Sequence, residues 1–298
     1  HQDDAYRHPT RDKAHGRIWR ISTTTPTTKP ANLSQAKLPE VLQALKAPEH
    51  WTRYQAKRAL TTRDRTTVSR ALDRWIQSLN PKDPDHEHHL YEALGAYATI
   101  EVVQPALLAR LLQAQDPNAR AYAARITGRW HDRLDAPLNL LADRIADENP
   151  RVRMEAVLAC AAIASPRSIE IAAAIVDKPM DDSLQYAFKQ TVHQLQPHWM
   201  PAFQKGTVSF AKPSHLAAVL NETGGREVLS SLQRLLDSQD LKSATKASAI
   251  ATILTVGGPR ELASYGLDPK RFTSADQYDP SAHADALAKL IEVARFRE

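Results

Sequence analysis

The sequence predicts an all-α protein, a solenoid of about seven stacked helix pairs preceded by a short strand. Alanine and leucine are abundant, whereas aromatic residues make up 6% of the 298 residues and only 9 are glycine. This composition favours helices that pack closely through small side chains, because strand-rich folds carry more β-branched residues and turn glycines. The prediction also rests on an internal repeat and on recurring helix-start signals.

The repeat is a basic or apolar residue followed three positions later by alanine, as in Arg120 and Ala123. We call the first residue of each copy its anchor. Successive anchors are separated by 37, 30, 33, 31, 31 and 31 residues. A period near thirty residues in a helical sequence is typical of a solenoid of helix pairs, such as HEAT repeats. The anchors are Arg53, Leu90, Arg120, Arg153, Leu184, His215 and Lys246.

Helix starts are marked by an Asp, Asn or Ser followed by proline. The first side chain caps a free backbone N–H, and proline loses nothing at the first helical position. Helices are expected at 136–147, 151–163, 169–177 and 183–195. One of them carries an apolar stripe that its own pair cannot bury, so neighbouring pairs must stack. The starts are Asp83-Pro84, Asp116-Pro117, Asn149-Pro150, Ser165-Pro166 and Asp279-Pro280, and the stripe is Val152, Ala156, Ala159, Cys160 and Ile163.

Both ends of the chain depart from the repeat. The segment 16–21 alternates polar and apolar residues, which is a strand pattern. We therefore expect a strand-bearing segment at 1–27, a linker at 28–34 and the solenoid at 35–264. An irregular segment with a C-terminal capping helix is expected at 265–298.

Several blocks carry a family resemblance: RHPTRDKAHGRIWRIS, WTRYQAKRAL, HHLYEALGAY, NARAYAARITGRW, NPRVRMEAVLACAA and PMDDSLQYAFKQTVHQLQPHW. Over roughly residues 5–205 they resemble PVC-type haem-binding proteins, a family also described as membrane-bound dehydrogenases. In that family a sorbosone-dehydrogenase-like propeller precedes HEAT repeats, and a cytochrome c domain follows them. The resemblance implies that 1–27 is the remnant of the last propeller strand, and that Leu38, Val41 and Leu42 lose their cover without the propeller.

The same resemblance implies an extracytoplasmic, periplasmic parent protein with haem c, and it is compatible with a quinone cofactor there. Haem c attachment needs Cys-x-x-Cys-His, and Cys160 is the single cysteine, so no cofactor is expected in this chain. No GxGxxG, GxxxxGK or GxSxG motif marks a catalytic site. We therefore predict a non-catalytic scaffold whose partners are the adjoining propeller and cytochrome c domains or other proteins.

The densest set of metal-ligand types is the stretch DPDHEHH, which contains His86, His88 and His89. His86 and His89 share one helix face, and His88 shares another with Glu92. These histidines are the only metal candidates. A polar first helical turn, with acids near the helix N-terminus, is the simpler interpretation, and no metal site is predicted.

The candidate interaction surface consists of Arg53, Lys57, Arg58, Arg120 and Arg153. The three anchor arginines occupy equivalent places, so a structural role is favoured, with Asp116 expected as the partner of Arg120. Three tryptophans near helix ends are interpreted as packing wedges: Trp51, Trp75 and Trp130.

Charge supports an alternative function. The net charge is +5, and the stretch 46–75 holds eight basic residues against three acidic ones. A nucleic-acid-binding protein resembling HEAT-like DNA glycosylases would carry such a stretch. Nucleic acid is the less favoured partner because Arg58 and Arg65 fall on different helix faces. No apolar run approaches the length of a transmembrane segment.

Overall fold

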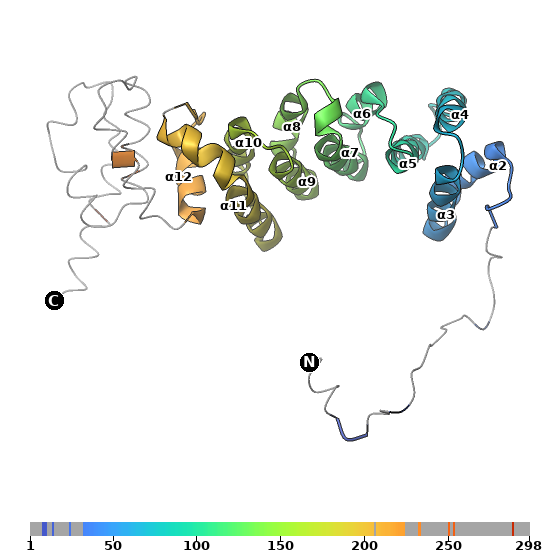
Figure 1. Ribbon diagram of the computed structural model, residues 1–298, viewed down its shortest axis with the longest axis horizontal. Helices are drawn as coiled ribbons and strands as arrows, with labels where there is room; N and C mark the ends of the chain where they lie inside the picture. Colours follow the sequence, from blue (N-terminus) through green and yellow to red (C-terminus); the bar gives the residue numbers. More distant parts are fainter. Residues whose placement is uncertain are drawn as a thin grey trace.

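The computed structural model describes residues 32–205 and 207–223, together with the isolated residues 8–10, 14, 24, 232, 233, 250, 253 and 288. Within these ranges the chain is a solenoid of helix pairs arranged in two rows (Figure 1). The predicted α-solenoid is thereby confirmed. The expected strand at 16–21, the anchor Lys246, the start at Asp279-Pro280 and the capping helix lie outside the described residues.

One row, drawn at the top of Figure 1, contains α4, α6, α8 and α10. The second row lies below it and contains α3, α5, α7, α9 and α11, while α2 and α12 lie at the two ends. Consecutive helices of the second row contact each other from α3 to α11. The bounds are α2 Leu38–Gln43, α3 His50–Thr61, α4 Arg65–Gln77, α5 His86–Thr99, α6 Pro105–Leu111, α7 Pro117–Arg129, α8 Pro137–Ile145, α9 Pro150–Ala161, α10 Pro166–Ala172, α11 Asp182–Gln204 and α12 Pro213–Glu222, with 3-10 helices at Ala44–Lys46, His131–Arg133 and Ala173–Asp177.

The anchors fall at equivalent places. Five of them are the third to fifth residues of the five second-row helices, and His215 is the third residue of α12. The period of about thirty residues is therefore the separation in sequence between one second-row helix and the next. Equivalent positions of successive repeats consequently lie side by side along the row.

Three predicted helix starts are confirmed in their capping chemistry. Asp116, Asn149 and Ser165 each accept the backbone N–H of the residue two positions later, at 2.9, 3.0 and 3.2 Å. The start at Asp83-Pro84 is wrong, because α5 begins at His86. The carboxylate of Asp83 accepts the N–H of Asp85 at 2.9 Å and so shapes the turn before the helix.

Two predicted helix ends also differ from the structure. The helix expected at 183–195 continues to Gln204, through Pro197 and Pro201. Its last turns bury Trp199 and Phe203, whose ring centres lie 6.1 Å apart. The two prolines have no backbone N–H to donate within the helix, and the helix continues through them with these aromatic side chains buried. The segment expected as one helix at 169–177 is the end of α10 followed by a 3-10 helix.

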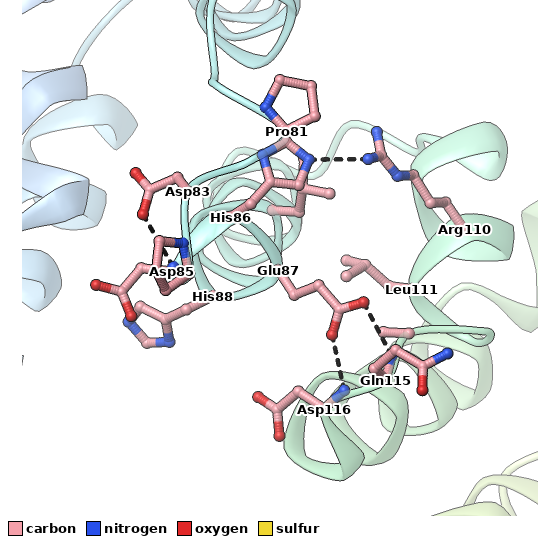
Figure 2. A pocket seen from close by; sticks show the side chains of 13 residues that line it. Pro81, Asp83, Asp85, His86, Glu87, His88, Arg110, Leu111, Gln115 and Asp116 are labelled. Atoms are coloured by element: carbon pink, nitrogen blue, oxygen red, sulfur yellow. Dashed lines mark hydrogen bonds between the residues drawn. The ribbon is translucent and has the colours of Figure 1, made fainter.

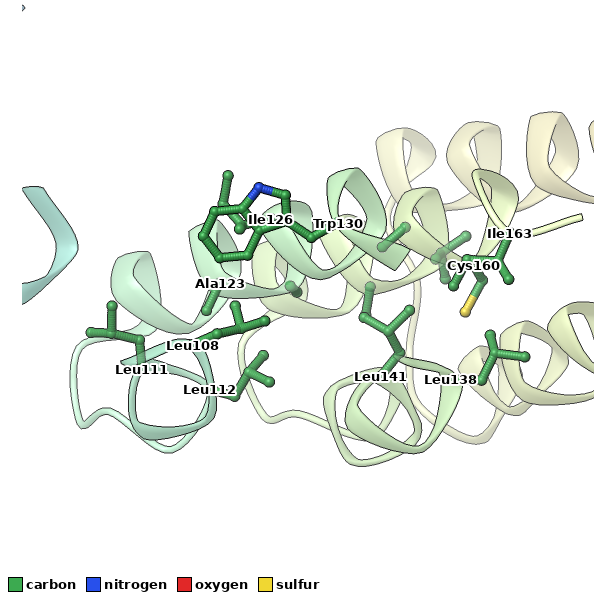
Figure 3. Packing of buried hydrophobic residues seen from close by; sticks show 14 of the residues in the cluster. Leu108, Leu111, Leu112, Ala123, Ile126, Trp130, Leu138, Leu141, Cys160 and Ile163 are labelled. Carbon is green, nitrogen blue, oxygen red and sulfur yellow. The ribbon is translucent and has the colours of Figure 1, made fainter. Parts of the chain in front are cut away.

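The core runs without interruption between the two rows. Figure 3 shows leucines of α6 and α8 pointing toward residues of α7 and α9. Trp130, which has no exposed surface, closes the end of α7. The predicted stripe on and just after α9 is buried throughout. The labelled core residues in Figure 3 are Leu108, Leu111, Leu112, Ala123, Ile126, Trp130, Leu138, Leu141, Cys160 and Ile163.

Helices α7 and α9 approach each other closely at Gly128. A methyl group on Gly128 would lie 2.8 Å from the Cα of Ala159, which is shorter than any normal contact. The glycine therefore allows the backbones of two neighbouring repeats to meet directly.

Two expectations about apolar exposure are wrong. Val41 and Leu42 are buried, because α2 packs against α3 and α4 instead of presenting this face to solvent. Trp75 and Trp130 are buried as wedges, but Trp51 is 57% exposed and its ring lies 5.6 Å from that of Tyr54.

Candidate interaction surface

The three anchor arginines make the same contact with the turn that precedes their helix. In each case the Nη1 group donates to the backbone carbonyls six and five residues upstream, at 2.7 to 3.0 Å. These carbonyls lie at the end of the preceding helix or in the turn after it, where several have no helical partner. We call this contact the arginine clamp; its pairs are Arg53 with Ala47 and Pro48, Arg120 with Ala114 and Gln115, and Arg153 with Asp147 and Glu148.

Each clamp arginine also reaches forward into the next repeat. Arg53 donates from Nε to Glu92 at 2.8 Å. Arg120 forms a two-point contact with Asp147, at 2.8 Å from Nε and 2.9 Å from Nη2. Arg153 donates to the carbonyl of Pro179 at 2.8 Å. The expected partner Asp116 is thus replaced by a carboxylate one repeat further along the chain.

Glu92 on α5 is the centre of a second cluster of charges. Its side chain is almost completely buried and accepts from Arg53 and from Lys57, the latter at 2.7 Å. His88 lies 3.8 Å from the same carboxylate. Two of the five candidate surface residues are therefore held by one buried acid, whose single negative charge offsets one of their two positive charges.

Arg58 is the candidate that remains directed at solvent. It is exposed on α3, and its guanidinium lies 6.0 Å from the centre of the Tyr54 ring. It has no carboxylate partner among residues 32–205 and 207–223. Arg58 thus presents its positive charge beside an aromatic surface.

The three candidate metal ligands have three different partners. His86 lies in a cleft of about 610 Å³ between the start of α5 and the turn from α6 to α7, where its Nε2 is 2.8 Å from Arg110 (Figure 2). His88 approaches Glu92, and His89 lies 3.8 Å from Asp83. Burial, together with the charge of Lys46, lowers the pKa of His89. Among the described residues, no group of three or more His, Cys, Asp or Glu is placed to hold a metal ion.

A carboxylate closes the opposite side of this cleft. Glu87 accepts the backbone N–H groups of Gln115 and Asp116 at 2.9 and 2.7 Å, as Figure 2 shows. These two N–H groups precede α7, so the contact joins the start of α5 to the start of the next second-row helix. Glu87, like His86 through Arg110, is thus engaged in repeat stacking.

The basic stretch 46–75 is divided between different parts of the fold. Arg65, Arg70 and Arg74 are exposed on α4 in the first row, whereas Arg53 and Lys57 are bound to Glu92 on the second row. No single face gathers them. This division weakens the nucleic-acid alternative.

Exposed apolar side chains on the second row were missed from the sequence. Among the described residues, the large hydrophobic side chains that remain exposed are Trp51 and Tyr54 on α3, Leu158 on α9 and Tyr186 on α11. The period indicates only one of them: Leu158 lies five residues after its anchor, where other repeats carry Arg58, Gly95, Arg125 and Lys189.

A shallow hollow of about 280 Å³ lies on this row between α7 and α9. Arg125 and Arg129 border it, and Gly128 contributes to its lining because α7 and α9 meet there. Glu155 accepts from Arg125, at 2.9 Å from Nε, and Arg129 pairs with Glu101. The side chains of both arginines remain about half exposed.

Comparison with known proteins gives one family match. Residues 104–192 match the model of HEAT repeats. Two crystal structures of engineered proteins, both Northeast Structural Genomics Consortium targets, are similar to this chain. The first is 19% identical with a TM-score of 0.37, and the match covers 85% of this chain and 68% of that chain. The second is 17% identical with a TM-score of 0.28, and the match covers 87% of this chain and 96% of that chain. No curated protein matches the chain.

None of the helices in the described part of the chain is long and apolar enough to cross a membrane. The family match runs from α6 to the first half of α11 within the two-row arrangement. The fold is therefore an α-solenoid of HEAT-like helix pairs, and its central segment, residues 104–192, is similar to HEAT repeats.

Proposed function

We propose that this chain is a non-catalytic HEAT-repeat scaffold that holds two neighbouring domains at a fixed separation. The observation that carries the proposal is the arginine clamp, which recurs in three repeats with the same two upstream carbonyls and a forward contact. Hydrogen bonds that involve a charged group contribute roughly 1.5–3 kcal/mol each. Because each clamp joins one turn to the next repeat, the orientation of successive repeats is restricted.

The neighbouring domains are proposed from the resemblance to PVC-type haem-binding proteins. On that basis a propeller dehydrogenase domain precedes this chain, and a cytochrome c domain follows it, in a periplasmic redox protein. Haem c and a quinone cofactor would then belong to the adjoining domains. The scaffold would contribute the distance between them and a surface for contact.

The reading frame on either side of this segment tests the proposed context. A propeller upstream and a Cys-x-x-Cys-His motif downstream are expected; unrelated domains or stop codons would contradict the context. The purified chain is also expected to show no haem absorbance and no dehydrogenase activity. A redox-active preparation of the chain alone would contradict the scaffold role itself.

The nucleic-acid alternative is tested separately. Binding to duplex DNA in a gel-shift assay at low salt, lost as salt increases, would support it. We expect no shift, because Arg53 and Lys57 are paired with Glu92 and the exposed arginines of the stretch are divided between α3 and α4, which lie on different rows.

A further inference from the structure

We infer that the exposed face of the second row binds an extended peptide segment that alternates acidic and apolar residues. This face, which we call the second-row face, consists of Trp51, Tyr54, Arg58, Arg125, Arg129, Arg151, Leu158, Tyr186 and Lys189. The inference rests on the proposed scaffold function and specifies the chemistry of a partner.

The first argument is the placement of exposed apolar surface. All four large hydrophobic side chains exposed in the described part of the chain lie on α3, α9 and α11, and none lies on the first row. Tyr186 is 65% exposed and Leu158 is 42% exposed. They form two groups, Trp51 with Tyr54 on α3 and Leu158 with Tyr186 on the neighbouring α9 and α11. Exposed aromatic and aliphatic side chains on one row are typical of protein-binding sites.

The second argument is the charge that remains toward solvent. The acids of α5 and α9 are engaged: Glu92 and Glu155 are buried in ion pairs, and Glu87 accepts two backbone N–H groups. Arg58, Arg151 and Lys189 have no carboxylate partner among the described residues. The second-row face therefore presents uncompensated positive charge, which is complementary to an acidic partner.

The third argument is the hollow between α7 and α9. Its lining combines the apolar side chain of Leu158 with Arg125 and Arg129, which pair with Glu155 and Glu101 but keep about half of their side-chain surface exposed. A carboxylate on a peptide would meet the arginines while a neighbouring apolar side chain contacts Leu158. A phosphate backbone would leave Leu158 and Tyr186 without a partner, so the face favours a peptide over nucleic acid.

The dimensions of the row set the length of the peptide. Neighbouring helix axes lie about 10 Å apart, so four steps from α3 to α11 span about 40 Å. An extended chain advances about 3.3 Å per residue, and about 12 residues would cross the row.

The experiment measures fluorescence anisotropy with the full chain and a labelled sixteen-residue peptide, Glu-Leu-Glu-Pro repeated four times. Proline keeps the probe extended. We expect saturable binding that Arg58→Glu and Leu158→Asp each weaken by about tenfold. Arg65→Glu makes the same charge change on α4 and is expected to leave binding unchanged. Circular dichroism confirms that each variant keeps its helical content.

Two further probes identify the source of any binding. A Glu-Ser-Glu-Pro peptide has the same charge without leucine and should bind at least several-fold more weakly. A sixteen-nucleotide oligothymidine should bind more weakly than the leucine peptide. The inference is overturned by no binding of the leucine peptide, equal binding of the serine peptide, tighter binding of the oligonucleotide, or equal effects of Arg65→Glu and Arg58→Glu. None of these outcomes depends on the reading frame, so failure here is distinguishable from failure of the proposed spacer function.

Discussion

The guanidinium of Arg120 on α7 and the carboxylate of Asp147, in the turn before α9, form a two-point contact across the boundary between two repeats. Arg144 approaches the same carboxylate at 3.3 Å, and Asp147 also accepts the backbone N–H of Asn149. One nearly buried acid therefore joins α7, α8 and the start of α9. Loss of this acid would leave two partly buried guanidinium groups without their partner.

Replacement of Asp147 by alanine is expected to lower the free energy of unfolding by about 3 kcal/mol, because a buried ion pair loses one member. Urea denaturation followed by circular dichroism measures the change. Glu148→Ala, at the neighbouring and highly exposed position, is the matched control: it removes only a solvent-exposed ion pair with Lys178 and should change the midpoint little. An equal effect of the two substitutions on the urea midpoint would contradict the prediction that the contact of Asp147 with Arg120 contributes more to stability than an exposed ion pair.

The same contact predicts how stability depends on pH. Burial by itself would raise the pKa of Asp147, but hydrogen bonds from Arg120 and Asn149 and the nearby guanidinium charges outweigh burial and lower it. A carboxyl group with a lowered pKa in the folded state stabilises the protein above its unfolded pKa of about 3.9. This contribution is lost as the pH falls through the lower, folded-state value.

The stability difference between the native protein and Asp147→Asn should therefore be constant from about pH 5 to pH 7 and should shrink below about pH 4. Urea midpoints measured at several pH values test this. A difference that stays constant down to the lowest pH at which the protein folds would contradict the lowered pKa.

Gly128 provides a test of close helix packing. Alanine there would gain up to about 1 kcal/mol of helix propensity, but its methyl group would lie 2.8 Å from the Ala159 backbone. Separation of α7 from α9 should outweigh the gain and destabilise the protein by about 1–3 kcal/mol.

Gly95→Ala is the matched control for this substitution. At Gly95 the nearest atoms are side-chain atoms of Lys57 and Tyr122 at 3.4 Å, which can move aside. This variant is expected to be neutral or slightly more stable in the same urea titration. Destabilisation of both variants by the same amount would mean that glycine is needed for another reason than the contact with Ala159.

The fold could be predicted where its causes are local. The caps at Asp116, Asn149 and Ser165 depend on side chains two residues from the amides that they accept, so the sequence indicates them directly. The end of α11 could not be predicted from Pro197 and Pro201, because burial of Trp199 and Phe203 depends on the neighbouring repeat.

The candidate surface could be predicted only in part for the same reason. The equivalence of Arg53, Arg120 and Arg153 was visible in the period, and it correctly located a shared contact. The carboxylate partner of Arg120 lies 27 residues away and is brought near by stacking, so local spacing pointed to Asp116 instead. The exposure of Trp51 likewise depends on the stacking of the helices, because no neighbouring helix covers its side chain.

The reactivity of the Cys160 thiol tests how tightly the helices pack around α9. Its side chain has no exposed surface in α9, and burial raises the pKa of the thiol to about 12. The thiolate is the form that reacts with disulfide reagents, so the folded protein at pH 8 should react slowly or not at all with dithiobis-nitrobenzoic acid. One equivalent should react in denaturant, and Gly128→Ala should speed the reaction, because separation of α7 from α9 opens the packing around the thiol. Rapid reaction of the native chain would contradict the closed packing of this repeat.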